Sequence, residues 1–263
     1  MPAGQQIKPQ TSWLGSPAIF LPRRQESQKF DEELTYRPRP SLVAWRFFIE
    51  YFRLTLPATI LALTLLGAAV LAVEMASILT PLALLLLLPL VLIGIGIALA
   101  LLVVLLKWGL IGKYRTRVEP LWSVFVRRSE LVTGLYETVM VPALLGWLTG
   151  TPWIAPALRL LGVKIGKRVW MGTTFITEFD LVEIGDDAVI GGLTSLQTHL
   201  FEDRVMKMST VKIGAGASVG PRSVVLYDAE VGAGASLDAL SLVMKGESLP
   251  AGSQWRGVPA RAI

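Results

Sequence analysis

The sequence has no cysteine, a single histidine and few charged residues. Without cysteine, the chain has neither a disulfide framework nor a thiolate zinc site. The one imidazole, His199, excludes a multi-histidine metal centre on a single chain, so we expect no metal. Charged residues make up 17% of the chain and hydrophobic residues 52%, which is more apolar than a typical soluble domain. This composition predicts that part of the chain lies in a lipid bilayer.

The basic residues give a modest net charge of +5 and gather beside the apolar segments. We interpret them as charges at the membrane surface, since no basic stripe interleaved with aromatic residues accompanies them. Membrane lipid is therefore an expected partner, and nucleic acid is not.

The apolar stretch Leu54–Leu106 contains Glu74 as its only charged residue. A helix needs roughly 20 residues to cross the bilayer core, so this stretch is too long for one span. We expect two transmembrane helices forming a hairpin, about Leu54–Val73 and Ile78–Leu106, with a turn at Glu74–Ser77. A buried globular helix pair is the alternative.

Basic residues flank this stretch on both sides, whereas the expected turn has none. By the positive-inside rule, both ends of the pair lie in the cytoplasm. We therefore expect a multi-pass membrane protein whose C-terminal domain is cytoplasmic. The flanking residues are Arg37, Arg39, Arg46 and Arg53 before the stretch, and Lys107, Lys113, Arg115, Arg117, Arg127 and Arg128 after it.

Prolines interrupt the regions on either side of the apolar pair. Residues 1–53 read as an irregular tail that leads into a helix near Ser41–Arg53. Residues 107–161 predict short amphipathic helices lying on the membrane surface. Packing of these helices beneath the C-terminal domain is the open alternative.

A period of six residues runs through the C-terminal region, which we delimit as residues 162–263. A mostly small residue, such as Ala217 or Ala235, comes four positions after each aliphatic one. This pattern predicts a coil of short parallel strands with the aliphatic residue inside and the small residue at the corner. The aliphatic positions are Ile213, Val219, Val225, Val231, Leu237, Val243 and Leu249, followed by Trp255.

An earlier block keeps the same stride, at Ile165, Met171 and Thr177 and again at Ile184, Ile190 and Leu196. The stride fails between Leu196 and Ile213, and this break contains His199. Because irregular excursions from a solenoid are where sites are built, the break is the expected site.

Residues 162–263 resemble the hexapeptide-repeat acyltransferases. The resemblance rests on the repeats, on the break with its histidine, and on the closing Gly257-Val258-Pro259-Ala260-Arg261. It implies a left-handed parallel β-helix that forms trimers with active sites between coils. It also implies a histidine base and an acyl donor carried on pantetheine, as in acyl-coenzyme A.

A narrower resemblance covers nearly the whole chain. Thr177–Val182, Gln197–Arg204 and Leu242–Glu247 look like the membrane-bound C-terminal region of bacterial nonribosomal peptide synthetases of the poly-lysine synthetase type. This implies an aminoacyl thioester donor on the phosphopantetheine of a carrier protein, an amine acceptor, and other synthetase domains as partners. Segment Trp13–Ala18 resembles Trp255–Ala260, which predicts a preceding β-helix module and leaves open a homotrimer or a tandem pseudo-trimer.

His199 is the candidate general base, because imidazole titrates near pH 6.5 and can accept a proton from an attacking amine. Asp203 or Glu202 is the candidate residue to orient its ring. A solvated ion pair of Asp203 with Arg204 or Lys207 is the alternative.

Other residues are candidates for binding the two substrates. Glu178, Asp180 and Glu202 are candidates to bind a cationic amino-acid substrate, although corner or surface carboxylates are the alternative. Near the C-terminus of the chain, four residues are expected to face the pantetheine arm and its phosphate: Lys245, Gly257, Pro259 and Ala260.

Three functions remain open. The first is condensation of a carrier-bound aminoacyl thioester with an amine. The second is a conventional acetyl or acyl transfer from acyl-coenzyme A. The third is a non-catalytic trimerisation and membrane scaffold. A carbonic anhydrase on a β-helix is excluded, because its zinc needs several histidines.

Overall fold

The structure, a computed structural model, describes residues 12–14, 19–21 and 30–263. Strands β1 (Ser12–Leu14) and β2 (Ile19–Leu21) pair antiparallel near the N-terminus. The segment Trp13–Ala18, predicted to echo the end of a β-helix module, lies partly outside the described residues, so that interpretation stays a prediction.

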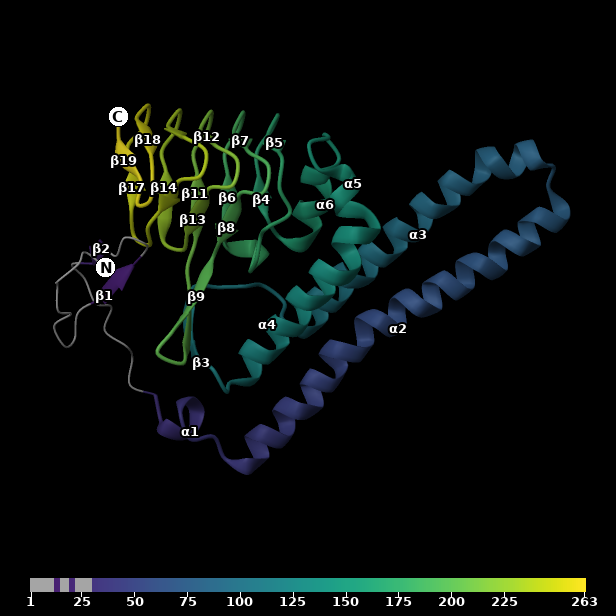
Figure 1. Cartoon of the computed structure of the whole chain (residues 1–263), viewed down its shortest axis with the longest axis horizontal. Coiled ribbons are helices and arrows are strands. Elements are labelled where there is room, and N and C mark those ends of the chain that lie inside the picture. Colours follow the sequence, from purple (N-terminus) through teal and green to yellow (C-terminus); the bar gives the residue numbers. More distant parts are fainter. Residues whose placement is uncertain (1–11, 15–18, 22–29) are drawn as a thin grey trace, which may run out of the picture.

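Two long helices, α2 (Pro40–Ile78) and α3 (Pro81–Leu110), follow the short helix α1 (Glu32–Thr35). Figure 1 shows α3 returning toward the body of the molecule from the far end of α2. The separate helix expected at Ser41–Arg53 is the first part of α2. The chain turns at Leu79–Thr80 and not at Glu74–Ser77, because Pro81 disfavours a helical conformation in the residue before it.

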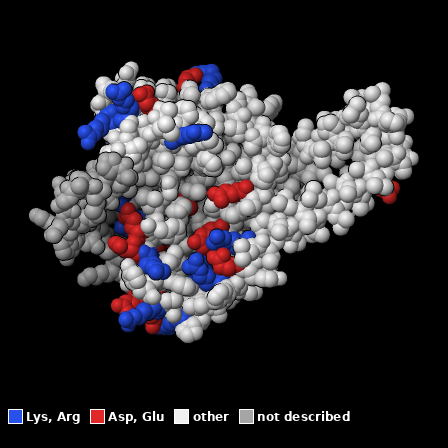
Figure 2. All heavy atoms as spheres, in the orientation of Figure 1, with Lys and Arg blue, Asp and Glu red and all other residues white. Residues whose placement is uncertain are grey.

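The outer parts of these helices expose apolar side chains such as Leu65 and Leu85. Figure 2 shows this end almost bare of charge. Three described helical segments are long and apolar enough to cross a membrane: Glu32–Ile78, Pro81–Leu110 and Val124–Leu148. The chain is thus suited to association with a membrane.

The third segment combines α4 (Val124–Leu135), a π-helix η1 (Tyr136–Leu145) and α5 (Gly146–Leu148). The sequence predicted short, separate helices here, but the structure joins them into one unit packed along α3. Gly96 of α3 permits the close approach, since a Cβ there would lie 2.6 Å from the carbonyl oxygen of Ala143. Helix α6 (Ile154–Leu161) then leads into the first coil.

The C-terminal region is a β-helix whose strands stack in three sheets (Figure 1). Its parallel strands follow the six-residue pattern of the sequence. One sheet contains β4 (Lys164–Ile165), β6 (Val182–Ile184), β11 (Val211–Ile213), β14 (Ala229–Val231) and β17 (Ser248–Leu249). The second contains β5 (Trp170–Met171), β7 (Val189–Ile190), β12 (Ser218–Val219), β15 (Ser236–Leu237), β18 (Gln254–Arg256) and the antiparallel β19 (Arg261–Ala262). The third contains β8 (Ser195–Gln197), β13 (Val224–Leu226) and β16 (Leu242–Val243).

The register confirms the repeat: Ile213 pairs with Val231 and Val225 with Val243, so one full coil takes 18 residues. The predicted inward aliphatic residues from Ile213 to Leu249 are buried. One earlier assignment was wrong, because Ile176 and not Thr177 bridges to Leu196 and points inward. The left-handed sense of the coil stays a prediction.

The break in the repeat is an ordered β-hairpin. Strand β9 (His199–Glu202) and strand β10 (Val205–Met208) pair antiparallel around a two-residue turn. Strand β3 (Arg117–Pro120), from the segment after α3, adds to the outer side of β10. The hairpin therefore ties the coil to the helical part of the chain.

Candidate active site

His199, at the start of β9, forms a pair with Glu178. Its Nδ1 lies 2.7 Å from Oε2 of Glu178. The side chain of His199 keeps 20% of its surface exposed, whereas that of Glu178 keeps 1%. Since an ionised carboxylate only accepts hydrogen bonds, Nδ1 of neutral His199 carries the proton and Nε2 carries the free lone pair.

Further hydrogen bonds hold the Glu178 carboxylate. Thr198 Oγ1 donates to Oε2 at 2.6 Å, and Ser129 Oγ of helix α4 lies 3.3 Å from Oε1. The Tyr114 hydroxyl lies 3.2 Å from Ser129 Oγ. Burial, followed by the negative charge of Glu178, raises the pKa of Tyr114, so this phenol stays a hydrogen-bond donor. Both the β-helix and the helical part thus orient the carboxylate.

The backbone at Glu178 is unusual. Its φ is +38°, in the left-handed region that non-glycine residues rarely adopt. Such a conformation in a buried residue costs free energy, and residues of this kind cluster at functional sites. Other non-glycine residues at turns of the coil, such as Asp187 and Arg222, adopt the same region, so the backbone of Glu178 does not by itself mark a site.

Asp180 anchors the same segment to the helices. Its Oδ2 lies 2.7 Å from Nζ of Lys107 at the end of α3 and accepts the backbone N–H of Tyr114 at 2.9 Å. The Lys107 side chain is fully buried. The role in binding a cationic substrate predicted for Asp180 conflicts with this arrangement, because the carboxylate is buried and already paired.

Asp203 does not contact His199, contrary to its predicted role as the orienting residue. Asp203 and Arg204 have φ values of +50° and +62° and form the two-residue turn of the hairpin. At about 3.3 Å per strand residue, Asp203 lies roughly 13 Å from His199. Glu178 takes the orienting position instead.

Glu202 was predicted to bind the cationic substrate and Lys245 the pantetheine arm, but in the structure the two side chains contact each other. Glu202 pairs with Lys245 and also with Lys207, whose Nζ lies 3.0 Å from Oε2. Burial alone would raise the pKa of Glu202, but the hydrogen bonds and charges of Lys245 and Lys207 outweigh it and lower that pKa. In this arrangement, Glu202 and Lys245 hold the hairpin against the coil.

The predicted donor-binding residues of the C-terminus occupy the last coil. Gly257 and Pro259 line a hollow of about 590 Å³ together with Arg256 and Arg261. Ala260 is buried beneath it, and its N–H donates to the carbonyl of Leu242. This end is separate from the residues that contact His199.

A cavity of about 200 Å³ opens beside His199, between the hairpin and the helices. Among the described residues, no group of three or more metal-ligating side chains lies together. The cavity is lined by Arg53, Ser129, Glu130, Thr133, Gly134, Glu137, Glu178, His199, Phe201 and Met206.

Sequence reasoning missed the contributions of Glu178, Thr198 and Ser129 to orienting His199. Thr177 and Thr198 lie on adjacent coils, with their hydroxyl oxygens 3.1 Å apart, which places Glu178 beside His199. The repeat does not predict this contact, because its 19-residue offset between Trp170 and Val189 would pair Thr177 with Leu196. Nothing in the repeat points to Ser129, which lies on a helix outside it.

These features define a β-helix of the hexapeptide-repeat kind, with a histidine–carboxylate pair where the coil meets apolar helices. A scan against known protein families finds no match. The chain is 43% identical over 252 residues to delta-poly-L-ornithine synthetase of Acinetobacter baumannii (strain AB307-0294). That similarity covers 95% of this chain but 19% of the relative, so the chain spans about a fifth of that protein's length. The predicted resemblance to a poly-amino-acid synthetase is confirmed.

Solved structures of acetyltransferases are similar over part of the chain. A hexapeptide-repeat acetyltransferase of Vibrio cholerae O1 biovar eltor, in complex with acetyl coenzyme A, has 18% identity and a TM-score of 0.39, covering 45% of this chain and 81% of that one. A galactoside acetyltransferase in complex with coenzyme A has 17% identity and a TM-score of 0.38, covering 45% and 76%. The β-helix is established independently of both by the strand pairing.

Proposed function

We propose that this chain is an acyltransferase module that condenses a carrier-bound aminoacyl thioester with an amine. The observation that carries the proposal is the hydrogen bond between His199 Nδ1 and Glu178 Oε2. It leaves Nε2 of His199 available as a base beside a cavity. The 43% identity to delta-poly-L-ornithine synthetase supports an aminoacyl group as the unit transferred.

In the proposed step, the amine nitrogen attacks the carbonyl carbon of the thioester. A C–N bond forms, the C–S bond breaks, and the pantetheine thiolate leaves. His199 Nε2 accepts the proton that the amine loses and can return it to the thiolate. The negative charge of Glu178 stabilises the imidazolium that exists between these two transfers.

The donor carries its acyl group on a pantetheine thioester. Carrier phosphopantetheine and acyl-coenzyme A present the same thioester arm. The hollow at Gly257 and Pro259 supports the proposal that the phosphate binds there, since Arg256 and Arg261 line it and guanidinium groups suit phosphate. Lys245 already forms an ion pair with Glu202.

We further propose that the reaction takes place at the cytoplasmic face of a bacterial inner membrane, with α2 and α3 as a transmembrane pair. Their apolar outer parts support this placement. The basic residues at the base of the pair support the proposed sidedness. An assembly of three β-helices, as a homotrimer or as tandem modules, remains part of the proposal.

The test compares the unaltered chain with His199→Ala in detergent or nanodiscs, with ornithine as the acceptor. Each protein receives ornithyl thioester on a phosphopantetheinyl carrier or, separately, on coenzyme A, and amide formation is followed by mass spectrometry. We expect amide from the carrier thioester and a loss of about 10²–10⁴-fold in rate for His199→Ala.

Val189→Ala on strand β7 is a control, because Val189 is exposed and does not line the cavity beside His199. It should leave the melting temperature near that of the unaltered chain. Equal rates for His199→Ala and the unaltered chain would overturn the catalytic role. Rates no higher than the uncatalysed background for both chains would favour the scaffold. A preference for the coenzyme A thioester would favour the conventional acyltransferase.

A further inference from the structure

The cavity beside His199 carries more negative than positive charge. Its lining holds the carboxylates of Glu130, Glu137 and Glu178 but one guanidinium, that of Arg53. Figure 2 shows acidic and basic groups gathered where the helices meet the body of the molecule. A hollow with an excess of carboxylates concentrates cations.

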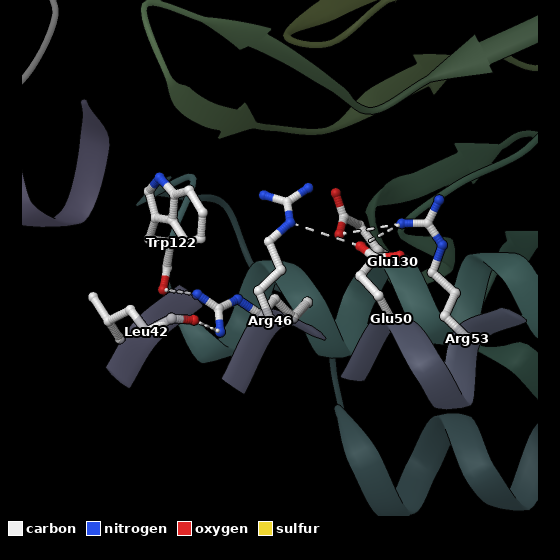
Figure 3. A network of polar contacts seen from close by, with 7 residues as sticks. Leu42, Arg46, Glu50, Arg53, Trp122 and Glu130 are labelled. Atoms are coloured by element: carbon white, nitrogen blue, oxygen red, sulfur yellow. Dashed lines mark hydrogen bonds and ion pairs between the residues drawn. The ribbon is translucent and has the colours of Figure 1, made fainter. Parts of the chain in front are cut away.

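The three carboxylates differ in what they already bind. Glu178 is committed to His199. Glu130 lies 3.5 Å from Nη1 of Arg53, which also contacts Glu50 at 3.2 Å, and Figure 3 shows this chain of charges running between α2 and α4. Among the described residues, Glu137 has neither an ion pair nor a side-chain hydrogen bond, and it is exposed. Glu137 is thus the carboxylate free to bind a ligand.

The position of Glu137 suits this role. It lies seven residues after Glu130, two helical turns along the same face. It is also the second residue of the π-helix η1, and irregular helical segments of this kind frequently occur at functional sites. The adjacent Tyr136 is fixed by a 2.7 Å hydrogen bond from its hydroxyl to the carbonyl oxygen of Thr174 in the β-helix. The turn that presents Glu137 is therefore held in place.

The chemistry of the proposed reaction limits what Glu137 can bind. An amine held as an ammonium ion by a carboxylate has no lone pair and cannot attack a thioester. A carboxylate that binds an ammonium group in this cavity must therefore serve an amine other than the reacting one. The cavity, at about 200 Å³, is smaller than pockets for drug-sized ligands, which suits a small acceptor.

We infer that Glu137 binds the second, non-reacting ammonium group of a small acceptor with two amino groups, such as a basic amino acid, while His199 deprotonates the first. This inference rests on the proposed function and names its acceptor class. It makes Glu137 a specificity-determining residue. The charge of the nearby Glu130 is neutralised by Arg53.

The kinetic test compares acceptors with two amines and with one. Ornithine is compared with norvaline and with 5-aminopentanoate, each of which lacks one of its amino groups. For Glu137→Gln, the ratio of kcat/KM for ornithine to that for the better monoamine should fall about tenfold. Glu230→Gln, the same charge change on an exposed residue of β14 away from this cavity, should leave that ratio unchanged.

Equilibrium binding separates this inference from the proposed function. Ornithine binding to the His199→Ala chain is measured by calorimetry, with and without Glu137→Gln. We expect Glu137→Gln to weaken binding about tenfold, whether or not His199 is catalytic. An unchanged acceptor ratio together with unchanged ornithine affinity, or no ornithine binding at all, would overturn the inference.

Discussion

The regular coils of the β-helix and its junction with the helices differ in the kinds of residue that they bury. The coils from Val211 to Leu249 fill their interior with aliphatic and small residues. The junction buries Glu178, Asp180 and Lys107. Burying charges costs free energy unless each is paired, whereas burying aliphatic surface is favourable. The coils thus contribute to the stability of the fold. The junction lowers that stability, because it buries the charged residues of a polar site.

This contrast explains why α3 and α4 are inseparable from the candidate site. Glu178, Phe179 and Asp180 are consecutive, and each contacts the helical part of the chain. Glu178 contacts Ser129, Phe179 packs against Tyr136 with ring centroids 4.9 Å apart, and Asp180 contacts Lys107. A movement of the helices would therefore reach the carboxylate that orients His199.

The largest effect is expected from breaking the buried ion pair. Asp180→Asn keeps the shape and an acceptor for the Tyr114 N–H but leaves Lys107 as an unpaired buried charge. We expect a loss of about 3–5 kcal/mol in unfolding free energy. We also expect reduced activity per folded molecule, because the neighbouring Glu178 loses its support. Chemical denaturation in detergent and single-turnover rates measure the two effects.

The double variant Lys107→Met with Asp180→Asn is the control for this prediction. Because it removes the unpaired charge, it should recover a large part of the lost stability. Equal stability of Asp180→Asn and the unaltered chain would show that the ion pair does not hold the junction.

A core substitution in the coils should affect stability alone. Leu237 is 2% exposed, and Leu237→Ala leaves a cavity that costs about 2–3 kcal/mol. Because Leu237 contributes to no contact of the junction, the rate per folded molecule should stay within about twofold of the unaltered chain. The same denaturation and single-turnover measurements apply. A loss of rate comparable to that of Asp180→Asn would erase the distinction between coils and junction.

The coils were the predictable part of the molecule, since each inward position repeats every sixth residue and its burial follows from its type. His199 was predictable because it interrupts that repeat. The hairpin around it was not, since a two-residue Asp203-Arg204 turn lacks the glycine that favours such turns. The role of Glu178 depends on insertions that change the coil length. Its contact with Ser129 depends on how a helix docks, which no local pattern specifies.

The most direct test of the central claim, that Glu178 orients His199 for base catalysis, is the rate of amide formation by Glu178→Gln. The amide keeps the size of the side chain and can still accept from Nδ1, but it carries no charge to stabilise the imidazolium. We predict a rate at least about 10²-fold below that of the unaltered chain, with an unchanged far-ultraviolet circular dichroism spectrum. A rate within about threefold, with the fold intact, would contradict the claim.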